Sequence, residues 1–157
     1  AEVLAGRAGL GEIVCGMTHA DPVVAMRCCD VAEKVSRHRP EWLSEQKAGL
    51  LALAERASQA ELRWHLAQML PRLALTAEEC RRLFAVFLTY RGDRSRIVQA
   101  MALDALVSLG GKSRALKPQA DAVLAEAEFS PVASVRARAR RLLKSTATRS
   151  RRPADRR

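Results

Sequence analysis

Apolar residues along this chain recur at helical spacing, and the pattern itself repeats about every 36 residues. Four segments share a turn followed by an apolar residue beside an arginine. They begin at Asp21, Gln59, Asp93 and Ser130. Aligning the segments on Met26, Leu62, Ile97 and Val135 gives steps of 36, 35 and 38 residues. A period in this range predicts a stack of helical repeats.

A second helical stretch lies between successive copies, so we predict eight helices in four antiparallel pairs. The pairs are 2–16 with 21–36, 41–57 with 59–73, a third pair from the Thr76 cap through the turn at 91–93 to Gly110-Gly111, and 116–129 with 131–145. No alternation of Val, Ile and Thr between hairpin turns predicts a strand. The chain is therefore expected to be all-α, with a repeat domain over 1–144 and a basic, disordered tail over 145–157.

Three local signals fix the expected helix ends. Thr76 with Glu79 three residues later forms a capping-box pattern at a helix start. Gly110-Gly111 is expected to stop the return helix of the third pair. Ser130 followed by Pro131 predicts a cap and first turn for the last helix.

The net charge of +10 is concentrated at one end of the chain. Residues 1–135 hold 17 lysines and arginines against 16 acidic residues, whereas residues 136–157 hold 10 against 1. Aromatic residues make up only 4% of the sequence, and alanine and leucine carry most of the apolar content. That composition favours closely packed helices.

Four cysteines, at positions 15, 28, 29 and 80, form no CxxC pair. Their spacing fits neither a zinc site nor a disulfide framework, so we expect buried free thiols in a reducing cytoplasm. His19, His38 and His65 are scattered without ligand spacing, and no cofactor is expected. No apolar run approaches the ~18 residues that a membrane helix needs.

The repeated second-helix pattern resembles HEAT repeats over about residues 2–144. The resemblance rests on Asp21-Pro22 and Ser130-Pro131 at the turn, and on the steps Met26-Arg27, Leu62-Arg63 and Val135-Arg136. The second copy lacks the turn proline, and the third places Arg96 before Ile97. The resemblance implies a right-handed α–α superhelix of about four HEAT-like helix pairs (eight helices), with second helices lining the concave side. It also implies that turn aspartates and helix arginines (Asp21, Arg27, Arg63, Asp93 and Arg136) bond between neighbouring repeats.

Arg63-Trp64-His65 is the most unusual triplet of the repeat region. Trp64 lies off the apolar stripe of its helix, so Arg63 and Trp64 are candidates for a partner-binding patch on the concave face. Packing between repeats is the alternative for all three residues.

Arginines also gather around the third turn, at Arg91, Arg94 and Arg96. Arg94 and Arg96 are candidates for binding a partner or an anion near a helix N-terminus. A solvated turn paired with Asp93 is the competing interpretation.

The last helix combines one apolar stripe with a basic remainder. The candidate nucleic-acid or anion-binding residues there and in the tail are Arg136, Arg138, Arg140, Arg141, Lys144, Arg149, Arg151 and Arg152. No aromatic residue is interleaved with them, so any nucleic-acid binding would be directed at the backbone. A terminal repeat with a polar outer face explains the same residues without a ligand.

We expect a non-enzymatic helical-repeat scaffold that binds a protein partner through its concave face. The alternative is a helical-repeat protein that binds nucleic acid through the basic C-terminal helix and tail. No catalytic constellation surrounds Asp30 or Asp104, the two aspartates on second helices, and no small-molecule ligand is expected.

Overall fold

The computed structural model describes the backbone of residues 9–150 and the side chains of residues 9–146. The described part is all-helical, with eight α-helices, two 3-10 helices and no strand. The elements are α2 (Leu10–Gly16), α3 (Pro22–His38), η1 (Pro40–Gln46), α4 (Lys47–Arg56), α5 (Ala60–Met69), η2 (Leu70–Arg72), α6 (Ala77–Tyr90), α7 (Arg96–Lys112), α8 (Lys117–Ala127) and α9 (Ala133–Ser150).

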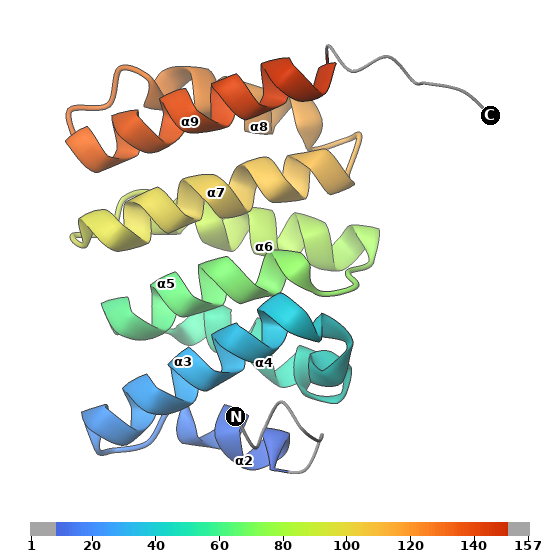
Figure 1. The fold of residues 1–157 in the computed structure, drawn as a ribbon, viewed down its shortest axis with the longest axis vertical. Coiled ribbons are helices and arrows are strands. Elements are labelled where there is room, and N and C mark those ends of the chain that lie inside the picture. The colour runs from blue at the N-terminus through green and yellow to red at the C-terminus, as the bar shows by residue number, and fades with distance from the viewer. Residues whose placement is uncertain (1–8, 151–157) are drawn as a thin grey trace.

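The helices form two layers (Figure 1). Helices α3, α5, α7 and α9 stack along the long axis of the molecule and run in the same direction, and we call them the second-helix layer. Helices α4, α6 and α8 lie behind them, and α2 lies below α3 at the end of the stack. We call these four helices the first-helix layer. Leucine, alanine and a few larger side chains fill the space between the layers as one continuous core.

The repeat has a slightly different register from the one expected. The first buried position of each second helix is Ala25, Leu62, Val98 or Val135, which gives steps of 37, 36 and 37 residues. Met26 and Ile97, chosen from the sequence as anchors, are 44% and 57% exposed. The mismatch arose because a small alanine, not the neighbouring methionine, fills the core position of the first repeat.

A polar contact recurs directly after that buried position. Arg63 Nε donates to the carbonyl of Ala57 at 2.7 Å, and Gln99 Nε2 donates to the carbonyl of Asp93 at 2.6 Å. In the last repeat, Arg136 Nη1 donates to the carbonyl of Ser130 at 2.7 Å. In each case the side chain satisfies a carbonyl six residues earlier, in the turn that precedes its helix.

Several predicted helix ends are confirmed and others are wrong. The Thr76 capping box is present, with both reciprocal hydrogen bonds to Glu79. The stretch expected as one helix over 41–57 is instead η1 followed by α4. Ser130 Oγ accepts from the Val132 N–H, but α9 begins only at Ala133, so Pro131 precedes the helix.

Gly110-Gly111 does not stop α7, which continues through Lys112. A Cβ placed on Gly110 would lie 2.3 Å from the Cβ of Ala120 in α8. Glycine at this position therefore allows α7 and α8 to approach closely, and it has a packing role in place of the expected terminating one.

The expected end of the last helix at residue 145 is also too early, because α9 continues through Ser150. Alanine and arginine favour helix, and no proline interrupts the chain before Pro153. The hydroxyls of Ser145 and Thr146 donate back to the carbonyls of Leu142 and Leu143. Residues 151–157 of the predicted tail lie outside the described residues.

Candidate functional site: an arginine-lined groove

Arg63, proposed from the sequence as either patch or packing, is used in packing between repeats. Its Nη1 lies 2.5 Å from Asp93 Oδ2, and its guanidinium carbon is 5.1 Å from the centre of the Tyr90 ring. Burial would raise the pKa of Asp93, but hydrogen bonds from the Ser95 N–H and Arg63 hold it below its usual value. The expected aspartate–arginine bond between repeats is therefore present at this junction.

Among the described residues, no aspartate–arginine ion pair joins neighbouring repeats at the other positions predicted for one. Asp21 accepts from the Val23 N–H and caps α3. Arg136 bonds within its own repeat, to the carbonyls of Ser130 and Pro131.

Trp64 is half-buried and stacks on His65, with ring centroids 3.5 Å apart. Its Nε1 donates to Glu61 Oε2 at 3.2 Å, and His65 Nδ1 lies 2.8 Å from the Glu61 carbonyl oxygen. The three side chains thus support one another on the first turns of α5.

Arg94, in the turn before α7, and Arg96, the first residue of α7, are both exposed. Arg91, the third arginine of this turn, pairs with Glu126 at 3.1 Å. Neither Arg94 nor Arg96 lines the groove described below.

The structure divides the basic residues of α9 into two groups. Arg138 and Arg141 approach Asp104 on α7, although Arg141 is largely exposed, whereas Arg140 and Lys144 are exposed and do not line the groove described below. The side chain of Arg149 and all of Arg151 and Arg152 lie outside the described residues.

Arg138 and Arg141 lead to a groove of about 540 Å³ in the second-helix layer, which we call the arginine groove. Its lining comes from α3, α5, η2, α7 and α9 and consists of Arg37, Ala67, Gln68, Pro71, Arg72, Met101, Asp104, Ala105, Ser108, Arg138 and Arg141. Four guanidinium groups from three separate elements, α3, η2 and α9, therefore converge on one hollow surface.

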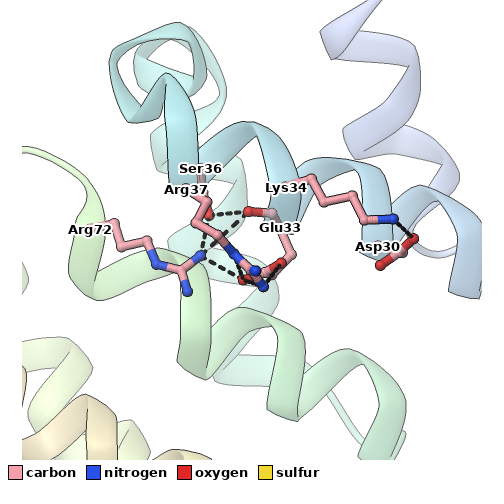
Figure 2. A network of polar contacts seen from close by, with 6 residues as sticks. All are labelled: Asp30, Glu33, Lys34, Ser36, Arg37 and Arg72. Atoms are coloured by element: carbon pink, nitrogen blue, oxygen red, sulfur yellow. Dashed lines mark hydrogen bonds and ion pairs between the residues drawn. The ribbon is translucent and has the colours of Figure 1, made fainter. Parts of the chain in front are cut away.

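A buried carboxylate, Glu33, holds the two arginines at the α3 end of this groove (Figure 2). Arg72 Nη1 lies 2.7 Å from Glu33 Oε1 and 2.8 Å from Ser36 Oγ. Arg37 Nη2 reaches both Glu33 oxygens, at 2.9 and 2.7 Å. Burial alone would raise the pKa of Glu33, but these hydrogen bonds lower it below its usual value.

The carboxylate of this network is buried, whereas its two arginines are partly exposed to solvent. The Glu33 side chain is 4% exposed, against 56% for Arg37 and 30% for Arg72. A guanidinium has five N–H donors in a planar fork, and the contacts to Glu33 and Ser36 leave part of each fork available. The neighbouring Lys34–Asp30 pair is separate and exposed.

Asp104 on α7 holds the arginines at the other end. Its Oδ2 lies 2.8 Å from Arg138 Nη1 and 3.9 Å from Arg141 Nη2. Burial raises the pKa of Asp104, and the two arginines offset that increase only partly. Its other oxygen, Oδ1, is buried and has no hydrogen-bond partner among the described residues.

The groove continues along the junction between α7 and α9. A second hollow of about 480 Å³ shares Asp104, Ser108 and Arg141 with the arginine groove. Lys112 and the hydroxyl residues Ser145 and Thr146 line its far part. Val107, Gly111 and Leu142 also line it, so this part of the surface is mixed. Its basic groups suit a ligand with negatively charged oxygens.

Sequence reasoning named Arg138 and Arg141 but missed Glu33, Arg37 and Arg72. The Glu33–Arg37 spacing of four residues is a detectable signal for a helical ion pair. The contribution of Arg72 had no such signal, because it is 39 residues from Glu33 along the chain.

The four cysteines are free. Cys29 and Cys80 are buried as expected, and burial raises the pKa of the Cys29 thiol to about 12. Cys15 is exposed and Cys28 is half-buried, whereas the sequence predicts that all four thiols are buried. Among the described residues, no three His, Cys, Asp or Glu side chains gather where they would hold a metal ion.

None of the described helices has the length and apolar character needed to cross a membrane. Searches against protein-family models, curated proteins and solved structures found no match to the chain.

Proposed function

We propose that this protein is a non-enzymatic helical-repeat scaffold that holds a segment of a protein partner in the arginine groove. In this proposal the stack is a right-handed, HEAT-like superhelix, and the second-helix layer is its concave side. The parallel arrangement of α3, α5, α7 and α9 supports it (Figure 1).

The observation that carries the proposal is the convergence of Arg37, Arg72, Arg138 and Arg141 on one groove. Arginine is favoured at protein interfaces because its planar fork forms several directed hydrogen bonds. Glu33 and Asp104 hold these forks before any partner arrives, which reduces the entropy lost on binding.

Nucleic-acid binding is the second candidate, and α9 favours it. Residues 133–150 contain five arginines and one lysine but no acidic residue. The groove itself favours a protein, because its lining contains no aromatic ring on which a base could stack.

Site-specific photocrosslinking in cells that express the protein separates the two candidates. A photoreactive phenylalanine analogue replaces Ser108, which is exposed in the groove, or Ala85, which is exposed on α6 in the first-helix layer. We expect protein crosslinks from position 108 that disappear when Arg141 is also changed to Gln, and none from position 85. Crosslinks from position 108 that nuclease removes would favour nucleic acid, and equal capture at both positions would contradict both candidates.

A further inference from the structure

The charges and unpaired hydrogen-bonding groups of the arginine groove indicate which chemical groups an occupant would need. We propose that the groove recognises an acidic protein segment, in which side-chain carboxylates pair with the arginines and a main-chain N–H faces Asp104. The inference rests on the proposed function, since it presupposes that a protein segment occupies the groove.

The charge of the groove defines the first requirement. Four guanidinium groups line it, and they are balanced by only two carboxylates, Glu33 and Asp104. The surplus is positive, and three of the arginines, Arg37, Arg72 and Arg138, are already held by these carboxylates. Carboxylate oxygens match the fork of an arginine in geometry as well as in charge.

The donors that remain on these arginines face the occupant. Arg72 contacts Glu33 and Ser36 through Nη1 alone, and Arg37 uses Nε and Nη2. Arg141 is 67% exposed and reaches Asp104 only at 3.9 Å. Each of these three arginines thus has N–H groups without a partner among the described residues. These groups can donate hydrogen bonds to a further carboxylate.

Asp104 adds the second requirement, which a simple anion does not meet. Its Oδ1 is buried, but the Asp104 side chain as a whole is 29% exposed and lines the groove, so an acceptor lies among the arginines. An occupant that brings an N–H or O–H donor beside its acidic groups therefore complements the groove better than a simple anion does. A peptide does so in every residue, because its main-chain N–H groups alternate with its side chains.

The composition of the groove favours a peptide over nucleic acid. Its lining contains no aromatic ring on which a base could stack.

Selection from a random peptide library displayed on phage tests the inference on the full chain. We expect the recovered peptides to be enriched in Asp and Glu relative to the unselected library. A synthetic peptide of the most enriched sequence should lose about tenfold in affinity when Arg141 is changed to Gln, since a charge-assisted contact is removed. Arg37→Gln, on a different helix, should weaken the same peptide in the same direction.

Arg140→Gln is the matched control, because Arg140 is exposed on the same helix but does not line the groove. It should change affinity by less than about twofold, through long-range charge alone. Circular dichroism spectra establish that each variant is folded.

Four results would overturn the inference: no recovered peptide, recovery without acidic enrichment, equal losses in Arg140→Gln and Arg141→Gln, or tighter binding of a short DNA duplex that depends on Arg141. If the peptide test fails but position 108 still crosslinks to protein in an Arg141-dependent way, the proposed function stands and only the acidic segment is excluded. If both fail, both proposals fall.

Discussion

At the scale of single residues, the two carboxylates of the arginine groove differ in how they are satisfied. Glu33 has hydrogen bonds to both of its oxygens, and its pKa is lowered. Asp104 has one oxygen without a partner among the described residues, and its pKa is raised. The ionised form of Glu33 therefore stabilises the fold. Folding instead disfavours the ionised form of Asp104, because burial removes it from water and its ion pairs compensate only partly.

Replacing Glu33 with Gln should destabilise the protein by about 2–3 kcal/mol at neutral pH, because Arg37 and Arg72 lose a buried counter-charge. A lowered pKa means that the stabilisation is present above the ordinary Glu value of about 4.3 and is lost as the pH falls through the folded-state value. Urea unfolding across pH measures the difference between wild type and variant. The exposed Lys34–Asp30 pair is the control, and Asp30→Asn should cost less than about 0.5 kcal/mol.

Replacing Asp104 with Asn should give the opposite pH dependence. Because the pKa of Asp104 is raised, its contribution is present below the ordinary Asp value of about 3.9 and is lost as the pH rises through the folded-state value. The stability of wild type relative to Asp104→Asn should therefore decrease as the pH rises above about 4, in the same urea experiments. A difference that grows with pH would show that Asp104 is well satisfied in the folded protein.

At the scale of helices, Gly110 and Gly111 are neighbours with different surroundings. A Cβ on Gly110 meets Ala120 at 2.3 Å, whereas one on Gly111 meets no atom within 4 Å. Gly110→Ala should destabilise by about 1–3 kcal/mol, since α7 and α8 must separate. Gly111→Ala should stabilise by about 0.5–1 kcal/mol, because alanine favours helix. Thermal melts of the two variants should therefore shift in opposite directions, and equal shifts would contradict the close approach of α7 and α8.

Helix positions could largely be predicted from the sequence, and their ends only where a side chain fixes them locally. The capping box at Thr76 is such a case. Gly110-Gly111 also looks like a local stop signal, but its role depends on Ala120 in the next helix, which no local pattern reveals. The same limit applies to Met26, whose exposure is decided by packing against α5.

At the scale of the whole molecule, the groove exists only because the stack brings distant segments together. Arg37, Arg72, Asp104 and Arg141 come from four different elements, and none is unusual in its own segment. The basic character of α9 was evident from the sequence. That Arg138 and Arg141 face Asp104, while Arg140 points away, follows from the position of α9 against α7.

The most direct test of the account is to map where an acidic peptide binds. The acidic peptide selected by phage display is titrated into the isotopically labelled full chain, and two-dimensional amide NMR spectra are recorded at each step. We predict shifts at Gln68, Arg72, Asp104, Ser108 and Arg141, with α6 and α8 unaffected. Shifts confined to the exposed face of α9, or spread over the first-helix layer, would contradict the arginine groove as the binding site.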